Sequence, residues 1–303
     1  MPNKISAVIV TYHPELKKLK EQVDRLVKQV QYVVIVDNNS ANANEIKQVF
    51  SEASYAGVVN LYYNGENKGL GYAQNKGISI AVNLGVLYVL LLDDDSLIEE
   101  NFVGNLISEY NHLTNNGKKV GAIGPVYYNE ETGEKYPITK YIGPLIDRRH
   151  PENEAVEATF LIASGCLIPV EVLNNVGLMN EDFFIDYIDV EWSFRAISKG
   201  YRLYATPKAQ MNHIIGERRA NVFGRKISIH SPLRKYYLFR NSIFMIKCPY
   251  ISFGYKVREI IFNFLRFITY MILTDDKKRY IRYAFLGYKD GFVGKKGRCT
   301  YNF

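Results

Sequence analysis

The sequence predicts an α/β fold, in which a mostly parallel sheet is covered by helices and followed by a helical, basic and aromatic C-terminal region. Short apolar, β-branched runs alternate with segments of helical periodicity through the first part of the chain, as in parallel sheets whose strands are joined by helices. The charge also divides: residues 1–216 hold 19 Lys and Arg against 26 Asp and Glu, whereas residues 217–303 hold 19 against 5. We therefore expect two domains, residues 1–230 and residues 231–303.

The composition is typical of a folded, water-soluble chain. Of its 303 residues, 47% are hydrophobic and 23% are charged, which argues against wholesale disorder. Three widely spaced cysteines are too few for a disulfide framework or a four-cysteine zinc site. The chain opens without the pattern of a secretory signal and holds no run of about 20 apolar residues. We expect a cytoplasmic protein without a spanning helix.

Strands and helices follow one another in a regular order. Apolar runs predict strands at residues 5–10, 32–36, 58–62, 86–92 and 120–126. Helical spacing of apolar residues predicts helices at residues 16–30, 72–84, 98–114 and 189–198, and from about residue 231 with a break at Cys248-Pro249. Residues 127–153 look irregular, and the apolar run 160–170 is interrupted by Ser164-Gly165-Cys166.

Polar clusters stand where the predicted strands end. Asp37-Asn38-Asn39-Ser40 follows the second strand and Asp93-Asp94-Asp95 follows the fourth. In open α/β sheets, ligands bind beyond the carboxyl ends of the strands. We therefore expect one site built from several loops at this edge of the sheet.

The aspartate triplet is the first candidate for chemistry. Alternation along an extended strand end places Asp93 and Asp95 on one side and Asp94 on the other. Two carboxylates on one face repel each other unless a cation lies between them, and such oxygen ligands suit Mg²⁺ or Mn²⁺. The alternative is an acidic turn at the start of the next helix.

The loops after the second and third strands offer ligands for a nucleotide. Asp37 can accept from a ring N–H or a ribose hydroxyl, or it can cap the following helix. Gly69 and Gly71 lie at a strand-to-helix turn, where backbone N–H groups can face an anion. However, Gln74 replaces the third small residue of a dinucleotide fingerprint, and this turn belongs to the third strand. A nicotinamide cofactor is therefore not expected.

Asp189 is the candidate general base. It lies at the start of a predicted helix, where the helix dipole favours the ionised carboxylate, which can take a proton from an attacking hydroxyl. The alternative is a helix cap with Glu191 in the first turn. Trp192 can serve as a sugar platform or lie in the core, and His213 can be a metal ligand or a structural residue.

The order of these motifs over about residues 4–245 resembles that of the family 2 glycosyltransferases, which are inverting enzymes with the Rossmann-like GT-A fold, and most closely their bacterial rhamnosyltransferase branch. The resemblance is carried by residues 8–12, 36–40, 67–77, 92–95, 186–195, His213 and 237–241, the last of which ends in Arg240-Asn241. One departure is Ile188, where many members of the family have Glu before the Asp.

The resemblance implies a role for each motif. Thr11, Tyr12 and Asp37 would hold the pyrimidine base. Further contacts to the nucleotide and the metal ligands would come from the remaining motif residues: Asn67, Gly69, Asp93 and Asp94 for the nucleotide, and Asp95, Asp93 and His213 for Mg²⁺ or Mn²⁺. Asp189 would be the catalytic base.

The implied reaction moves a sugar, with dTDP-L-rhamnose as the favoured donor, to a hydroxyl of a saccharide or lipid-linked saccharide in cell-surface polysaccharide synthesis. The alternatives are a donor of the UDP-sugar class and a sugar-nucleotide-binding protein without catalysis. The second alternative needs no base, so the activity of an Asp189 variant separates it from an enzyme.

The basic aromatic tail predicts a surface that meets something anionic. No nucleic-acid-binding module is recognisable around it, so nucleic acid is not expected as a partner. We expect a peripheral contact with the inner, anionic face of the cell membrane. The alternative is a helical layer that packs on the sheet or on a second subunit in a homo-oligomer, with aromatic residues such as Phe262, Phe264 and Phe267 in the packing.

Overall fold

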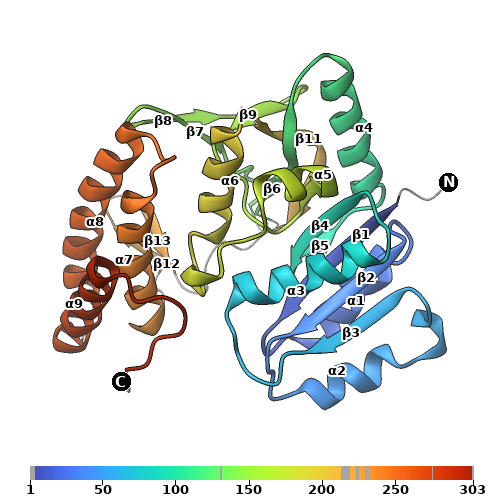
Figure 1. Cartoon of the computed structure of the whole chain (residues 1–303), viewed down its shortest axis with the longest axis horizontal. Coiled ribbons are helices and arrows are strands. Elements are labelled where there is room, and N and C mark those ends of the chain that lie inside the picture. Colours follow the sequence, from blue (N-terminus) through green and yellow to red (C-terminus); the bar gives the residue numbers. More distant parts are fainter. Residues whose placement is uncertain are drawn as a thin grey trace.

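A computed structural model describes residues 4–129, 132–212, 219–222, 225–228, 232–274 and 276–301. Within them, nine strands form the main sheet, in the order β3-β2-β1-β4-β10-β6-β11-β5, with β9 beside β11 (Figure 1). The first four strands are parallel: β1 (Ile5–Thr11), β2 (Tyr32–Asp37), β3 (Val59–Tyr63) and β4 (Tyr88–Asp93). The remaining strands are β5 (Leu97–Ile98), β6 (Val120–Tyr128), β9 (Val156–Ala158), β10 (Cys166–Pro169) and β11 (Arg202–Asn212).

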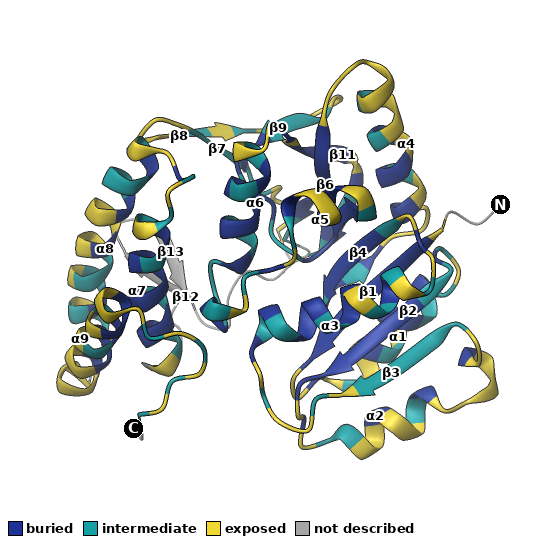
Figure 2. Cartoon of the chain, viewed as in Figure 1, coloured by how far each residue is buried: buried dark blue, intermediate teal, exposed yellow. Residues whose placement is uncertain are grey.

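Helices cover both faces of this sheet, as the sequence predicted. One face carries α1 (Leu16–Leu26), α2 (Ala43–Phe50) and α4 (Phe102–Asn115). The other carries α3 (Leu70–Asn83), α5 (Val170–Val176) and α6 (Ile188–Ser198). Alternate residues of one strand enter the two cores: Val8 faces α3, whereas Ile9 faces α1. Such burial on both faces explains why these strands read as continuous apolar runs (Figure 2).

The predictions fail where long-range pairing decides the structure. The segment expected to be irregular holds an antiparallel hairpin, β7 (Ile138–Ile142) and β8 (Leu145–Arg149). The helix expected from residue 98 begins at Phe102, because Leu97 and Ile98 pair with the end of β11. Of the apolar run 160–170, only β10 is a strand, and it runs antiparallel to both β4 and β6.

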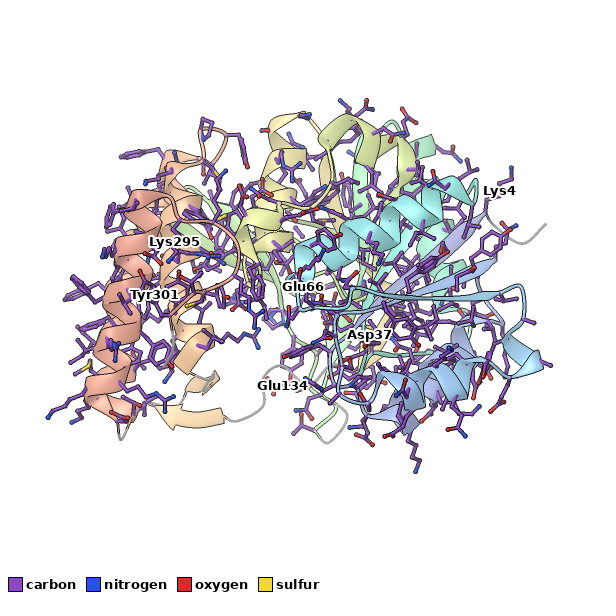
Figure 3. The ribbon with its side chains drawn as sticks, turned by 60° about the horizontal axis from the view of Figure 1, so that its bottom comes forward. Lys4, Asp37, Glu66, Glu134, Lys295 and Tyr301 are labelled. Carbon is purple, nitrogen blue, oxygen red and sulfur yellow. The ribbon has the colours of Figure 1, made fainter. Side chains whose placement is uncertain are left out.

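The C-terminal region is helical, with the expected break before α8. It comprises α7 (Pro232–Lys247), α8 (Phe253–Leu273) and α9 (Lys277–Val293), preceded by the hairpin β12 (Arg219–Val222) and β13 (Arg225–Ser228). These helices form a layer at the opposite end of the molecule from Lys4, and the segment with Lys295 and Tyr301 runs beside them (Figure 3). The division at residue 230 stays a prediction. No helix in the described part of the chain is long and apolar enough to cross a membrane.

Candidate active site

Three strand ends meet at one edge of the sheet. Thr11 at the end of β1 donates from Oγ1 to Oδ1 of Asp37 at the end of β2, over 3.0 Å. The backbone N–H of Tyr12 donates to Oδ2 of Asp94 after β4, over 3.2 Å. Parallel strands in the order β2-β1-β4 bring these loops side by side, so the sequence-predicted residues of this edge do lie together.

Asp37 is buried, and much of its capacity as an acceptor is used within the protein. Its Oδ2 accepts the backbone N–H groups of Asn39 and Ser40, at 3.1 and 3.0 Å. Tyr12, by contrast, is 51% exposed, and its ring lies against that of His13. Asp37 thus closes the turn after β2, but it does not cap the following helix, which begins at Ala43 with Asn42 as its N-cap. Tyr12 offers an open aromatic face at the same edge.

Asn38 organises the neighbouring loop and was not singled out from the sequence. Its Nδ2 donates to Oδ1 of Asn67 over 3.0 Å, and its Oδ1 accepts from Asn64 Nδ2 and Lys68 N, each over 3.1 Å. Asn67 Oδ1 also accepts the N–H of Gly69 over 3.0 Å. The two predicted loop residues, Asn67 and Gly69, are thus fixed by an amide on the neighbouring strand end, a signal visible in the sequence only as a run of Asn.

The three aspartates differ in their surroundings. Asp93 and Asp94 are half-buried, whereas Asp95 is exposed. Burial, together with the negative charges of Asp95, Asp94 and Asp189, raises the pKa of Asp93 to about 7. Burial also raises the pKa of Asp94 to about 6, against the opposing hydrogen bond from Tyr12. These carboxylates repel one another, and a hard divalent cation would relieve that repulsion.

The described residues contain no preformed group of three or more His, Cys, Asp or Glu side chains arranged to hold a metal ion. The oxygen donors of the triplet fit Mg²⁺ or Mn²⁺ chemically, but further ligands must come from elsewhere. His213, the third expected ligand, lies outside the described residues.

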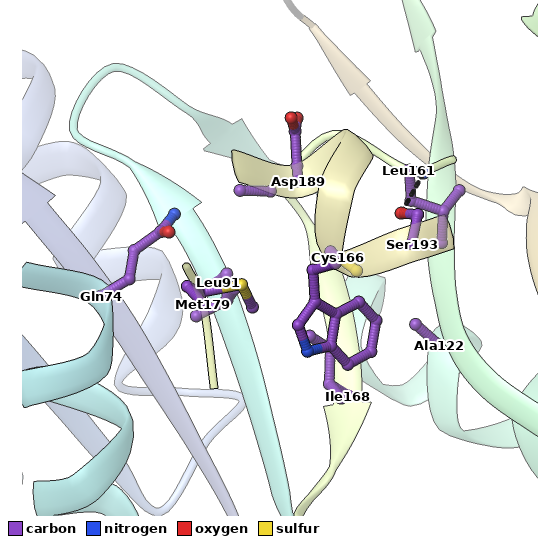
Figure 4. A pocket seen from close by; sticks show the side chains of 11 residues that line it. Gln74, Leu91, Ala122, Leu161, Cys166, Ile168, Met179, Asp189 and Ser193 are labelled. Atoms are coloured by element: carbon purple, nitrogen blue, oxygen red, sulfur yellow. Dashed lines mark hydrogen bonds between the residues drawn. The ribbon is translucent and has the colours of Figure 1, made fainter. Parts of the chain in front are cut away.

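Asp189 lies at the second position of α6, and its Oδ1 accepts the N–H of Val190 over 2.8 Å. A small cavity beneath it is lined mainly by apolar side chains, including Leu91, Cys166 and Met179, while the carboxylate points away from them (Figure 4). Burial raises the pKa of Asp189 to about 6, although bonds from backbone N–H groups oppose this. The start of a helix favours the ionised carboxylate, as expected from the sequence, but desolvation outweighs this effect and leaves the pKa above its usual value.

The charge of Asp189 contributes to the raised pKa of Asp93, so the two carboxylates lie within electrostatic range. The structure thus combines an aspartate triplet at the end of β4 with a half-buried carboxylate on α6 across the same site.

Comparisons with known proteins agree with this geometry. The family model "Glycosyl transferase family 2" matches residues 6–177. The chain is 32% identical, over the full length of both proteins, to a protein of Shigella flexneri named "dTDP-rhamnosyl transferase RfbF". The chain belongs to glycosyltransferase family 2.

Solved structures show the same fold. A structure of GalNAc-T7 with UDP, GalNAc and Mn²⁺ has a TM-score of 0.58 at 17% identity, and the match covers 88% of this chain and 57% of that one. S. aureus TarS in complex with UDP-GlcNAc has a TM-score of 0.56 at 14% identity, covering 92% and 79%. The expected GT-A fold is therefore confirmed for this glycosyltransferase.

The loop that leads to Asp189 has an unusual backbone. Phe184, Asp186 and Tyr187 have φ values of 64°, 62° and 66°, in the left-handed region. For residues with a Cβ this conformation costs roughly 1 kcal/mol or more each, so the glycosyltransferase must hold the loop by other contacts.

Arg240 and Asn241 supply those contacts from the buried side of α7. Arg240 donates to the carbonyl oxygens of Asp182 and Phe183, over 3.2 and 2.8 Å. Asn241 Nδ2 lies 3.0, 2.7 and 3.2 Å from the carbonyl oxygens of Phe183, Ile185 and Asp186. The family resemblance included the dipeptide Arg240-Asn241 but assigned it no role. The structure shows that it anchors this loop.

Two further groups fix the start of α6. Arg234 forms a bidentate ion pair with Asp186, with contacts of 2.9 to 3.1 Å. The hydroxyl of Tyr187 donates to Glu259 of α8 and accepts from Arg266 over 3.0 Å. None of these pairs was predicted, because the partners are 48 or more residues apart in the chain.

Gly69 lies against the same loop. With φ of 90°, it allows a close approach to Phe184, since a Cβ there would fall 2.7 Å from the Phe184 ring and carbonyl oxygen. Leu70 N donates to that oxygen over 2.6 Å. The turn at Gly69 therefore joins the β3–α3 loop to the loop that precedes the candidate base. The role of Gly69 in binding the nucleotide stays a prediction.

Trp192 lies in the core, as the alternative held: it is buried and donates from Nε1 to Gly177 O over 2.9 Å.

Gln74 was noted only as a departure from a fingerprint. It lies at the cavity beneath Asp189, and its buried Oε1 has no hydrogen-bond partner in the described part of the chain (Figure 4).

We expect Asp93→Asn to raise the thermal stability of the ligand-free enzyme, by a gain that grows with pH. The pKa of this carboxyl group is about 3.9 in the unfolded chain and about 7 in the folded protein. Its contribution to the stability of the folded state is therefore complete below about pH 4, and it is lost as the pH rises through about 7 and the buried group ionises. The amide does not titrate. Melting temperatures measured across this range should separate by a few degrees, and a separation that is constant or shrinks with rising pH would contradict the raised pKa. Asp147→Asn, on the surface, is the control.

Proposed function

We propose that this glycosyltransferase moves L-rhamnose from dTDP-L-rhamnose to a hydroxyl of a saccharide or lipid-linked saccharide, with inversion, in cell-surface polysaccharide synthesis. The main support for this reaction is that the half-buried carboxylate of Asp189 lies within electrostatic range of the aspartate triplet at the end of β4. The name of the full-length relative supports the donor.

The nucleotide is proposed to bind at the strand edge. Tyr12 offers an exposed ring for the base, beside Thr11 and Asp37. Asn67 and Gly69 line the same loop, and Asp93 and Asp94 lie next to the ribose and diphosphate. The hydrogen bonds that already link these loops would hold the pocket in shape before the nucleotide arrives.

Asp95 and Asp93 are the proposed ligands of Mg²⁺ or Mn²⁺, with His213 as the third. The structure of GalNAc-T7 with UDP, GalNAc and Mn²⁺ supports a divalent ion in this fold. Such an ion, when bound, neutralises charge that develops on the leaving diphosphate.

Asp189 is proposed to accept the proton of the acceptor hydroxyl as its oxygen attacks the anomeric carbon. The diphosphate leaves from the opposite face of the sugar, so the configuration inverts. A pKa near 6 leaves Asp189 mostly ionised at neutral pH, yet basic enough to share the proton in the transition state. Arg240 and Asn241 would keep the carboxylate at the required position.

A donor of the UDP-sugar class is the second candidate, supported by the UDP of the GalNAc-T7 structure and the UDP-GlcNAc of the TarS complex. A sugar-nucleotide-binding protein without catalysis would share the strand-edge pocket but would not need Asp189. We further propose that the enzyme is cytoplasmic and peripheral to the inner face of the cell membrane, where a lipid-linked acceptor would be available.

Calorimetric titration with dTDP and UDP, each with and without Mn²⁺, tests the donor site. We expect dTDP to bind at least tenfold more tightly than UDP, and the affinity to fall at least tenfold without Mn²⁺ or in Asp95→Asn. Asp147→Asn should bind like the wild type. Preference for UDP would select the second candidate, and absence of binding by both nucleotides would leave the triplet as an acidic turn.

A further inference from the structure

An apolar face on the C-terminal helices is turned away from the rest of the protein. On α8, the exposed apolar side chains repeat every three or four residues: Ile260, Ile261, Phe264, Leu265, Ile268 and Ile272. On α9, Ile281, Phe285 and Phe292 continue the pattern. We call these nine residues the outer apolar face. Phe264, Ile272 and Phe285 are each about two-thirds exposed, at 64%, 67% and 66%.

The opposite side of α8 is tied to the enzyme. Glu259 and Asn263 are buried, and Asn263 donates to Ser242 of α7 over 2.8 Å. Phe267 packs among the aromatic residues between α7 and α9, as the packing alternative expected, whereas Phe262 and Phe264 remain exposed. The inner side of α8 accounts for its folding, so the exposed face has no role within the described chain.

Basic side chains share this outer surface. Lys278, Arg282 and Lys289 of α9 are exposed and lie one helical turn from Ile281, Phe285 and Phe292. Of the described acidic residues on α8 and α9, Glu259 and Asp290 are buried, and Asp276 caps the first turn of α9. The outer surface is thus apolar and positively charged.

We propose that the outer apolar face and its basic neighbours are the docking surface for an anionic lipid bilayer; this rests on the proposed function. Apolar side chains enter the boundary between head groups and acyl chains while Lys and Arg meet the lipid charges. A symmetric contact with a second copy through this face is disfavoured, because it would bring Arg282 and Lys289 against the same positive surface. In Figure 2, the outer sides of α8 and α9 are largely exposed.

The helix that carries most of the outer apolar face also contacts the loop before Asp189. The inner side of α8 carries Glu259 and Arg266, which contact Tyr187, and Asp189 follows two residues later. The loop that precedes the candidate base is thus bonded to the side of α8 opposite the outer apolar face. This arrangement suits an acceptor carried on a lipid.

Flotation with vesicles of phosphatidylcholine, alone or with phosphatidylglycerol, tests the surface at about 0.1 M salt. We expect binding to the anionic vesicles only, and a loss of tenfold or more in partitioning for Phe264→Ser/Phe285→Ser and for Arg282→Gln/Lys289→Gln. Leu87→Ser and Lys118→Gln change an exposed apolar residue and an exposed basic residue near the sheet, and should bind like the wild type.

Absence of binding to anionic vesicles, or unchanged binding by both double variants, would overturn the proposal. So would a dimer in sedimentation that both double variants convert to a monomer without any vesicle binding. Titration with dTDP and Mn²⁺ on the same proteins keeps the two proposals apart: nucleotide binding without vesicle binding rejects only the docking surface. Vesicle binding without nucleotide binding rejects the donor assignment.

Discussion

Asp189→Asn lowers sugar transfer by about 10² to 10⁴-fold, the usual contribution of a general base, while dTDP binding stays within a few-fold of the wild type. The amide keeps the shape of the side chain and its place at the start of α6 but cannot take a proton. Because the charge of Asp189 raises the pKa of Asp93, its removal should also lower that pKa and leave the triplet better able to bind a cation. Release of dTDP from dTDP-L-rhamnose, with a lipid extract as the source of acceptor, measures the effect.

Asp147→Asn is the matched control, since it removes one carboxylate from a surface ion pair with Arg149, a kind of pair that contributes little to stability. Near-normal transfer by Asp189→Asn would contradict its role as base. If the wild type itself released no dTDP, the better interpretation would be a sugar-nucleotide-binding protein without catalysis.

Asn241→Asp is expected to reduce turnover by about tenfold to a hundredfold, a loss that a displacement of about 1 Å can cause. The amide nitrogen faces three carbonyl oxygens of the loop before Asp189, and a carboxylate there would repel all three. The left-handed residues Phe184, Asp186 and Tyr187 would then lose a contact that holds them. Because Asn241 lies away from the strand edge, the KM for the donor and the affinity for dTDP should change less than threefold.

Ser242→Ala separates this positioning role from general destabilisation. Ser242 is the next residue on α7, is equally buried, and is bonded to Phe239 and Asn263 instead of the loop. Both variants should lose stability, since each disturbs a buried hydrogen-bonded group. Turnover should fall only in Asn241→Asp, when both are assayed well below their melting temperatures. Equal loss in the two variants would indicate that α7 acts only through stability.

The sequence by itself predicted the elements whose signal is local. Apolar runs of five to seven residues identified β1, β2, β3 and β4, and helical spacing identified α1, α3 and α6. Parallel strands joined by helices place their carboxyl ends at one edge of the sheet, so the polar clusters that follow them were expected at that edge. That is why Thr11, Asp37 and Asp94 were predicted together and are found together. The helical spacing over residues 189–198 placed Asp189 at the start of a helix, where the structure has it.

Tertiary structure alone decided what depends on pairing between distant residues. The hairpin of β7 and β8, the antiparallel β10 and the late start of α4 are fixed by partners elsewhere in the chain, and no periodicity reports them. The pKa of Asp189 could not be predicted from its helix position, because the apolar cavity beneath it is built from β4, β10 and α6. The role of Arg240-Asn241 was equally hidden, since its partners lie more than 50 residues away. Sequence determines residue chemistry and local shape, whereas burial and long-range hydrogen bonds arise only when the fold brings distant segments into contact.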